Sequence, residues 1–316
     1  MMGTLVDFTL YSDNKKNASI AIKAASDEMQ RIEQLFSIYG EQPNAIKTFN
    51  TSVPNTPVKL PDEVNTLLTQ AEQLRHKSLG AFNPALGSLN KLWGFSRSVD
   101  DSLPAPSSPP AVDQISALQA ASMHCIQKHH QNRWSRKNRN CELDFGAIAK
   151  GYALEQGMQA LKSHGIQNAI INAGGDIKVS GKHGGRAWKI GIRHPRHAEK
   201  VIATIKIEGD LSIVTSGDYE RFYIYKGKRY HHILNPKTGM PATKTQSATV
   251  VTTNATSADA WSTALFVTGL EGIKSIEKLG MNAILIDADG KIHTTENIES
   301  RLQLSVSPPM LRTSEH

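Results

Sequence analysis

The stretch Leu143-Asp-Phe-Gly-Ala-Ile-Ala-Lys-Gly-Tyr-Ala-Leu-Glu155 decides how the rest of this 316-residue chain is interpreted. Its pattern predicts the end of a strand, up to Phe145, followed by a helix that starts near Ala147. Gly146 permits a sharp turn between the two elements. Asp144 would then lie at the polar tip of the strand.

Small residues at this helix start leave room for another group to approach the backbone. Lys150 lies in the first turn, where the helix dipole disfavours a cation. An anion held by the free N–H groups, as a phosphate would be, removes that conflict. A lysine that points into solvent explains the same residues equally well, so both interpretations stay open on these residues alone.

The composition is that of a globular protein, with 39% hydrophobic and 21% charged residues. No apolar run reaches the length of about 18 residues that a membrane-spanning helix needs. The first residues, Met1 to Asp7, lack the basic and apolar regions of a signal peptide. We therefore expect either a cytoplasmic protein or one whose leader is missing from this chain. The formal net charge of +7 favours anionic partners without choosing among nucleotides, nucleic acids and membrane surfaces.

The chain has two cysteines, Cys125 and Cys141. Two are too few for a disulfide framework or a cysteine zinc site. One bridge in an oxidising compartment and two free thiols are both compatible with the sequence.

The order of elements predicts an α+β fold of mostly antiparallel strands with inserted helices. Strands are expected at 4–10, 169–172, 188–192, 201–207 and 248–253, and hairpins at 221–233 and 283–293. Helices are expected at 22–36, 61–74, 113–120, 258–267 and 273–279, and a loop at 80–89. No Gly-x-Gly-x-x-Gly follows a strand and there is no Walker A motif, which argues against Rossmann and P-loop folds.

A segment rich in proline and serine, Leu103–Pro110, predicts an exposed connector. We expect a single domain over residues 1–316, which could comprise two interleaved α+β subdomains.

A basic stretch, Lys128–Arg139, lies within a strand-like segment that runs from Met123 to Phe145. Nucleic-acid binding would use such cations with Trp134 as a stacking platform. No RNA- or DNA-binding motif accompanies the charges, so a solvated hairpin face is the preferred interpretation.

Asp259 and Thr263 are four residues apart on an expected helix and therefore share a face. A carboxylate and a hydroxyl are hard-oxygen ligands of the kind that Mg²⁺ prefers. Thr256 and Asp259 also fit a capping box, which would make Asp259 an ordinary first-turn residue. Taken alone, the capping interpretation is the stronger one.

Three further stretches combine glycines with polar groups. Val214–Arg221 predicts a strand that runs into a glycine turn. In His231–Gly239 a histidine leads into a proline-containing turn, which could present an imidazole for proton transfer. In Asn172–Asp176 paired glycines permit close backbone approach, although a β-bulge would explain them as well.

Each stretch is weak alone, but their order and spacing are specific. The chain resembles the ApbE family, the FAD:protein FMN transferases, across nearly its whole length. The matching segments, in order, are 2–4, 35–39, 81–84, 92–94, 143–155, 172–176, 215–221, 232–241 and 258–263.

Family members transfer FMN from FAD to a threonine or serine hydroxyl of a partner protein and release AMP. The resemblance implies Mg²⁺ at the Ala147 carbonyl, Asp259 and Thr263, with Ser262 where some members have a second acidic residue. It implies flavin and adenine contacts at Met2, Tyr39, Ala81, Phe82, Asn83, Asp144, Lys150 and Ile233. Lys150 stands where some relatives have a glutamate, and either residue can line the phosphate region.

By its motif, His232 is the best-placed base for the acceptor hydroxyl, although a purely orienting role stays open. A histidine base predicts a rising limb in the pH profile near the ordinary histidine pKa. The adjacent His231 should face the other way on its strand, so we expect its replacement to be nearly silent.

The acceptors of the family are membrane subunits of sodium-translocating NADH:quinone oxidoreductase and Rnf-type complexes, marked by a short Ser/Thr-Gly-Ala-Ser/Thr-like segment. Members are commonly exported to the periplasm and often anchored to the inner membrane. Hydrolysis of FAD to FMN and AMP would use the same site, and storage of FAD is a further alternative.

Overall fold

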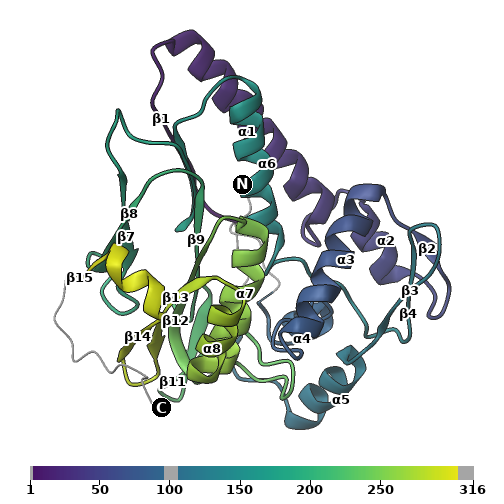
Figure 1. Cartoon of the computed structure of the whole chain (residues 1–316). Coiled ribbons are helices and arrows are strands. Elements are labelled where there is room, and N and C mark those ends of the chain that lie inside the picture. Colours follow the sequence, from purple (N-terminus) through teal and green to yellow (C-terminus); the bar gives the residue numbers. More distant parts are fainter. Residues whose placement is uncertain (1–2, 96–105, 305–316) are drawn as a thin grey trace.

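The computed structural model describes residues 3–95 and 106–304 of the chain (Figure 1). Met2, one of the implied flavin contacts, lies outside the described residues, as do residues 103–105 of the expected connector. The rest of that connector, residues 106–110, has no helix or strand, as the prolines predict.

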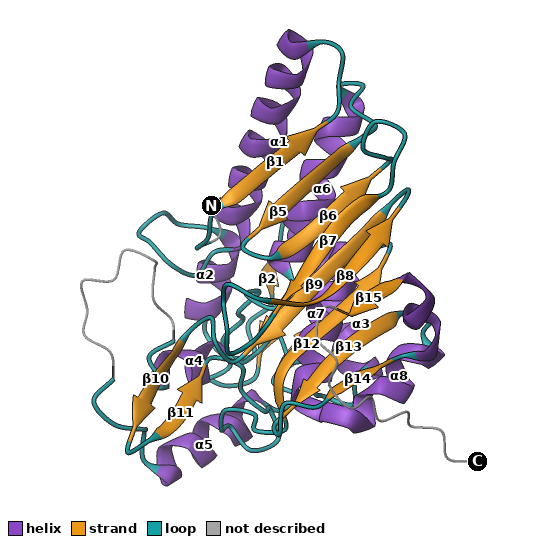
Figure 2. Cartoon of the chain, turned by 90° about the vertical axis from the view of Figure 1, so that its left-hand side faces the viewer, coloured by secondary structure: helices purple, strands orange, loops and turns teal. Residues whose placement is uncertain are grey.

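A seven-stranded antiparallel sheet lies at the centre of the fold, in the order β1-β5-β6-β9-β12-β13-β14 (Figure 2). Its strands are β1 (Val6–Leu10), β5 (Ala169–Ala173), β6 (Asp176–Ser180), β9 (Leu211–Gly217), β12 (Thr245–Thr252), β13 (Asn282–Asp287) and β14 (Ile292–Thr294). The combination of this antiparallel sheet with flanking helices confirms the expected α+β class.

Both faces of the large sheet are covered (Figures 1 and 2). One face packs against a three-stranded sheet made of β7 (Trp188–Arg193), β8 (Val201–Ile207) and β15 (Leu302–Leu304). The other face packs against helices α1 (Lys15–Phe36), α6 (Ala149–Ser163) and α7 (Ala255–Thr268). In β13 the side chains alternate accordingly, since Ile284 faces the small sheet and Leu285 faces the helices.

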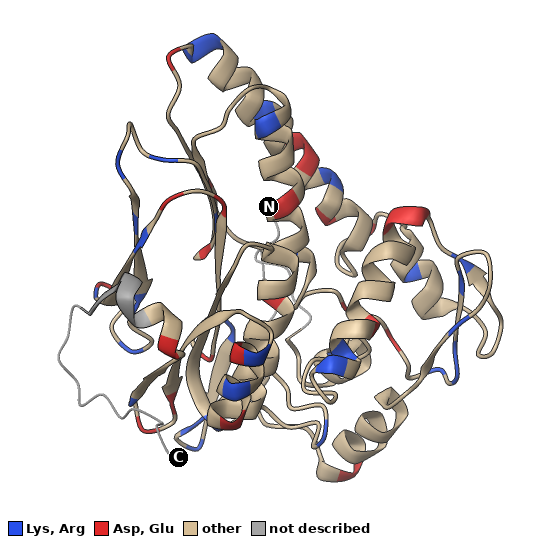
Figure 3. Cartoon of the chain, viewed as in Figure 1, with Lys and Arg blue, Asp and Glu red and all other residues tan. Residues whose placement is uncertain are grey.

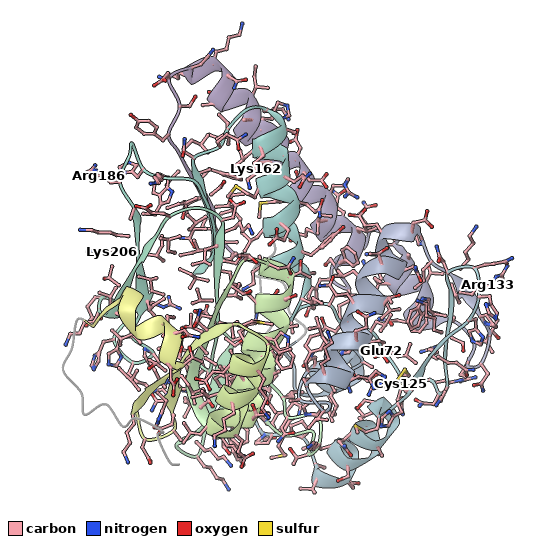
Figure 4. The ribbon with its side chains drawn as sticks, viewed as in Figure 1. Glu72, Cys125, Arg133, Lys162, Arg186 and Lys206 are labelled. Atoms are coloured by element: carbon pink, nitrogen blue, oxygen red, sulfur yellow. A yellow bond between two sulfur atoms is a disulfide. The ribbon has the colours of Figure 1, made fainter. Side chains whose placement is uncertain are left out.

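Between α1 and α6 the chain leaves the sheet and forms a helical lobe, on the right in Figure 1. Its elements are α2 (Ala45–Thr51), β2 (Val58–Lys59), α3 (Asp62–Lys77), α4 (Gly87–Leu92), α5 (Val112–Ser122), β3 (Ile126–Lys128) and β4 (Arg133–Arg136). Cys125 and Cys141 form a disulfide in this lobe (Figure 4). Of the two alternatives left open by the sequence, the structure has the bridge.

The remaining described elements follow β9 and α7. They are β10 (Phe222–Tyr225), β11 (Lys228–His231), η1 (Gly269–Gly272), α8 (Ile273–Lys278) and η2 (Glu296–Arg301). Both expected hairpins are confirmed, and that of β10 and β11 turns at Lys226 and Gly227, which have φ of 48° and 76°. In the described part of the chain, no helix is both long and apolar enough to cross a membrane.

The prediction that Leu143–Phe145 ends a strand is wrong. Only Glu142 makes an isolated bridge, to Leu86, and the residues that follow are irregular. The Asn50 side chain takes the place of a neighbouring strand: its Oδ1 accepts from the Leu143 N–H at 2.7 Å, and its Nδ2 donates to the Leu143 carbonyl at 2.9 Å. Alternating side chains do not reveal that a backbone is paired with a side chain.

Three other local expectations also need correction. The loop predicted at 80–89 contains the start of α4 at Gly87. The glycines of 172–176 form no β-bulge, since Gly174 and Gly175 make the tight turn between β5 and β6. The strand-like pattern of 123–145 is limited to β3 and β4.

The basic stretch 128–139 runs along β3 and β4 at the outer edge of the lobe (Figure 3). Trp134 is only 2% exposed, and its Nε1 donates to Oδ1 of Asn65 at 2.9 Å. An indole that is buried in this way offers no stacking platform for a base. The expectation that Trp134 would stack on a base of a nucleic acid is therefore wrong.

Candidate functional site

The site is built where the first turn of α6 crosses α7. A Cβ at Gly151 would overlap the Ala255 carbonyl oxygen and lie 2.8 Å from the Cβ of Asp259. Glycine is therefore required for the two backbones to come this close. At this distance the Gly151 N–H donates a 2.8 Å hydrogen bond to Oδ2 of Asp259.

The start of α6 leaves one carbonyl group available. The helix begins at Ala149, two residues later than predicted, because Ile148 has φ −151° and ψ −29°. The N–H of Gly151, which in a longer helix would donate to the Ala147 carbonyl, donates to Asp259 instead. Within the described residues, the Ala147 carbonyl accepts no hydrogen bond.

Asp259 is not a capping residue. Helix α7 begins at Ala255, and the side chain of Asn254 caps it by accepting from the Ser257 N–H at 2.8 Å. The capping box proposed for Thr256 and Asp259 is thus wrong, and Asp259 is 5% exposed in the second turn of the helix.

Two hydroxyl groups follow Asp259 on α7. The Thr263 hydroxyl, one turn further along, lies 3.2 Å from Oγ of Ser216 on β9. Ser262 is fully buried and donates to the Asp259 carbonyl at 2.8 Å. Ser262 thus stabilises the backbone of α7 by a hydrogen bond within the helix.

Lys150 forms an ion pair with Asp176 at the start of β6. Asp176 is 2% exposed, and its Oδ1 accepts from the Thr215 N–H at 3.0 Å. Burial lowers the pKa of Lys150, but the charges of Asp176, Asp259 and Glu220 outweigh it and raise this pKa above its ordinary value. Lys150 is therefore charged and directed inward, so the interpretation in which it points into solvent is wrong.

Negative charge exceeds positive charge in this buried corner. Burial, and next the charge of Asp176, raise the pKa of Asp259 to about 7. Two carboxylates thus share one ammonium group, and a divalent cation would relieve their repulsion. No cluster of three or more His, Cys, Asp or Glu that could hold a metal occurs in residues 3–95 and 106–304. A metal here would depend on a carboxylate, a carbonyl and a hydroxyl, which suit Mg²⁺.

The implied flavin contacts are distributed around this corner. Asp144 is fixed by two hydrogen bonds of 2.8 Å, in which its Oδ1 accepts from the Gly146 N–H and its Oδ2 from Nδ2 of Asn90. Its own N–H donates to the Pro84 carbonyl at 2.8 Å, which brings the 81–84 loop alongside. The structure thus joins two segments that are 60 residues apart in the sequence.

The other implied contacts differ in exposure. Ala81, Phe82 and Ile233 are buried in the large core, at 5%, 2% and 5% exposure, which limits them to packing or backbone contacts. Asn83 and Tyr39 are half-buried. Tyr39 follows α1, whose Phe36 ring lies 5.2 Å from the Phe145 ring.

His231 is the last residue of β11, and His232 lies in the bend that follows it, so the strand period does not extend over both residues. His231 is 4% exposed; its Nε2 donates to the Ala242 carbonyl at 2.7 Å and its Nδ1 accepts from the Ile233 N–H at 3.3 Å. His231 is therefore a core residue, and its replacement will not be silent.

His232 is half-buried, and its Nδ1 lies 3.3 Å from the Arg221 carbonyl. A proton on Nδ1 would be donated to that carbonyl and would leave Nε2 as the acceptor. Burial, and next the Arg221 charge, lower the pKa of His232 to about 3. The imidazole of the ligand-free protein is thus neutral at neutral pH, which predicts no rising limb near the ordinary histidine pKa.

Sequence reasoning gave no role to Asp176 or to Ser216, both of which the structure brings to this corner. The structure shows that β6, which reads Asp-Ile-Lys-Val-Ser, is buried along its whole length. A carboxylate in such a strand needs a charged or hydrogen-bonding partner. Lys150 is that partner, but its distance along the sequence conceals it.

Comparisons with known proteins agree with this arrangement. The sequence profile of the ApbE family matches residues 2–285. The FAD:protein FMN transferase of Treponema pallidum is 32% identical over 332 aligned positions, which cover 96% of this chain and 87% of that protein.

Solved structures have the same fold. The ApbE protein of Thermotoga maritima has a TM-score of 0.85 at 33% identity, over 95% of this chain and 96% of that chain. A mutant of the flavin transferase ApbE from Vibrio cholerae has a TM-score of 0.79 at 26% identity, with the same coverage. With the profile match over most of its length, this chain belongs to the ApbE family.

Proposed function

We propose that this protein is a transferase that moves FMN from FAD to a serine or threonine hydroxyl of a partner flavoprotein and releases AMP. One observation carries the proposal beyond family membership. Asp259 is buried beside Asp176 and Lys150 and lies one turn from Thr263, and it accepts the Gly151 N–H that in a longer helix would donate to the Ala147 carbonyl. This arrangement suits a cation and the pyrophosphate of FAD.

In the proposed reaction the acceptor oxygen forms a bond to the phosphorus of the FMN half. The bond between that phosphorus and the bridging oxygen breaks, and AMP leaves with the bridging oxygen. No oxidant or reductant takes part. The acceptor hydroxyl loses its proton, and the ester that forms is a phosphodiester between FMN and the protein.

Mg²⁺ would be held by the Ala147 carbonyl, Asp259 and Thr263, and would supply charge neutralisation at the phosphate oxygens. Lys150 keeps a positive charge beside Asp176 and adds to that field. The Gly151 N–H holds the Asp259 carboxylate in one orientation, so that no reorganisation is needed during the reaction.

His232 is proposed to accept the proton of the acceptor hydroxyl at Nε2. Its Nδ1 is directed at the Arg221 carbonyl, which fixes the ring. A base with a pKa of about 3 is weak, so FAD and the acceptor must strengthen it or it must chiefly orient the hydroxyl. The negative charge of the pyrophosphate would strengthen this base, since it favours the protonated imidazole and so raises the pKa of His232.

The acceptors are proposed to be subunits of sodium-translocating NADH:quinone oxidoreductase or of Rnf-type complexes. The test incubates the protein with FAD, Mg²⁺ and a peptide that carries a Ser/Thr-Gly-Ala-Ser/Thr segment. We expect the peptide to gain the mass of an FMN group, with one AMP released for each peptide modified. A matched peptide with alanine in place of its hydroxyl residues should gain nothing.

The same experiment separates the two alternatives. AMP release without a mass gain on the peptide would mean that the protein hydrolyses FAD. Binding of FAD without any AMP would mean that it stores FAD, and the transferase proposal would be wrong.

A further inference from the structure

Two contacts between α6 and α7 follow a common register. Gly151 of α6 donates to Asp259 of α7, and one turn further along α6 the side chain of Glu155 accepts a hydrogen bond from the Ala255 N–H. From the first contact to the second, the position moves four residues forward in α6 and four residues backward in α7. The facing stripes of the two helices are therefore antiparallel and aligned turn by turn.

Two of the proposed metal ligands, Asp259 and Thr263, lie one turn apart on α7. The third, the Ala147 carbonyl, directly precedes α6, whose first residue is Ala149. The spacing between the α7 ligands and this carbonyl therefore depends on how α7 is aligned against the start of α6. A slide or rotation of α7 would displace Asp259 and Thr263 together, relative to the Ala147 carbonyl.

Lys178 holds Glu155 in its place. The Lys178 side chain is 6% exposed, and its Nζ lies 3.0 Å from Oε1 of Glu155. Nζ also donates to the Thr253 carbonyl, directly before the Asn254 cap of α7. A buried ammonium keeps such partners because an unpaired one is costly. Strand β6, helix α6 and the start of α7 are therefore joined at one point.

We propose that Glu155, held by Lys178, is a positioning residue that sets the register of α7 against α6 and so the spacing of the Mg²⁺ ligands. The proposal rests on the metal-dependent function proposed above. Mg²⁺ demands a nearly ideal octahedron, so a small shift of two ligands weakens its binding. A carboxylate at the start of α7 also stabilises that helix end.

Two double variants with equal charge test the proposal. Glu155→Gln with Lys178→Met removes the ion pair but keeps an oxygen that can accept from the Ala255 N–H. Glu155→Ala with Lys178→Met removes the ion pair and that oxygen. The readout is direct binding of Mn²⁺, a hard-oxygen stand-in for Mg²⁺, measured by the electron paramagnetic resonance of the free ion at a temperature below each melting transition.

We expect the Gln/Met variant to bind Mn²⁺ within about twofold of the unchanged protein, and the Ala/Met variant to bind it roughly tenfold more weakly, as for lost outer-shell partners of a metal site. Equal affinities in the two double variants would overturn the proposal, because the accepting oxygen would then have no effect. Glu155→Asp, which keeps the charge but shortens the side chain, should also weaken binding by several-fold, and unchanged binding by it would count against the proposal.

Two references complete the experiment. Lys162→Gln breaks the 2.6 Å ion pair with Asp210 at the far end of α6, where Figure 4 labels the lysine, and should leave Mn²⁺ affinity unchanged. A loss of affinity there would mean that any disturbed ion pair on α6 weakens the site, against the proposal. Asp259→Ala should abolish binding. If Asp259→Ala binds Mn²⁺ normally, the proposed metal site itself is wrong. That result differs from one in which Asp259→Ala loses Mn²⁺ binding and the two Glu155 double variants bind Mn²⁺ equally, which would overturn only the role of Glu155.

Discussion

The Gly151 N–H donates its hydrogen bond to the carboxylate of Asp259 on the neighbouring helix, and not to the Ala147 carbonyl four residues earlier in its own chain. One donor thus orients an acidic side chain, while the carbonyl that it would otherwise satisfy is left for another partner. The two effects require the backbones of α6 and α7 to lie almost in contact, which makes this glycine the first residue to test.

Gly151→Ala should destabilise the protein by about 1–3 kcal/mol, because the added Cβ overlaps the Ala255 carbonyl and forces the helices apart. It should also abolish FMN transfer. Urea denaturation and the peptide assay measure the two effects. Gly157→Ala is a matched control on the same helix, since its Cβ would meet the flexible side chain of Met29, at 2.9 Å. Equal damage from both variants would contradict the special role of Gly151.

Asp259→Ala should abolish transfer and weaken FAD binding only modestly, because the pyrophosphate loses its counter-charge while contacts to the rings survive. Thr263→Val keeps the shape of the side chain but removes its oxygen, so it should raise the Mg²⁺ concentration needed for half-maximal transfer. Asn254→Ala is the control: it removes the true cap of α7, at a cost of about 1 kcal/mol, without touching a ligand. Full transfer by Asp259→Ala at ordinary Mg²⁺ would refute the ligand assignment.

Tyr39→Ala should raise the dissociation constant of FAD, because we expect the ring to stack on part of that molecule. The loss of one stacking contact costs about 0.5–1.5 kcal/mol beyond burial, which corresponds to a moderate change. Fluorescence titration with FAD measures it, and Tyr39→Phe should retain most of the affinity. An unchanged affinity together with a lower melting temperature would identify Tyr39 as a packing residue.

His232→Asn should lower the transfer rate by roughly 10²–10⁴-fold and leave FAD affinity nearly intact, since proton removal occurs only on the way to the transition state. Because the pKa of free His232 is about 3, the imidazole is already unprotonated well below neutral pH. The pH profile of kcat/KM for FAD, which reports the protein before FAD binds, should therefore have no rising limb between pH 5 and pH 8 that depends on His232. Such a limb, lost in the variant, would contradict the low pKa.

His231 cannot serve as the control for that experiment. His231→Asn removes a buried ring that bonds the Ala242 carbonyl and packs edge-on, at 5.4 Å, against Phe266. It should cost about 1–3 kcal/mol of stability. His130→Asn, at an exposed position between β3 and β4, is the better control and should change neither rate nor stability.

Reduction of the Cys125–Cys141 bridge should lower the free energy of unfolding by about 3 kcal/mol, as expected for a closed loop of this length. Urea denaturation with and without a reductant measures the change, and Cys125→Ser with Cys141→Ser should reproduce it. If the oxidised and reduced proteins unfold at the same urea concentration, the bridge contributes nothing to stability.

Sequence patterns correctly predicted the helices and turns that depend only on residues close together in the sequence. The apolar positions of α1, from Ala21 to Phe36, recur at helical spacing, and Lys226-Gly227 marks the turn of a hairpin. Side-chain alternation did not reveal that β11 ends at His231, nor that this histidine is buried in the core.

The site was harder to predict, because its residues contact partners that are far away in the sequence. Asn254 and Thr256 are both acceptable caps, and only the position of α7 on the sheet decides between them. The sequence correctly indicated a positive charge at Lys150, but its partner Asp176 belongs to β6, which follows α6 in the sequence. The strand wrongly predicted at Leu143–Phe145 has the same origin, since its partner is the Asn50 side chain.

The place of β1 at the edge of the large sheet has a consequence for the order of folding. Val6 pairs with Ala173, and α1 packs along α6, so the first two elements to leave the ribosome have partners that are made much later. Such high contact order slows folding and leaves apolar surface exposed meanwhile. The amino-terminal half should therefore be a strong client for holding chaperones during synthesis, until the segment that carries α6 and β5 emerges.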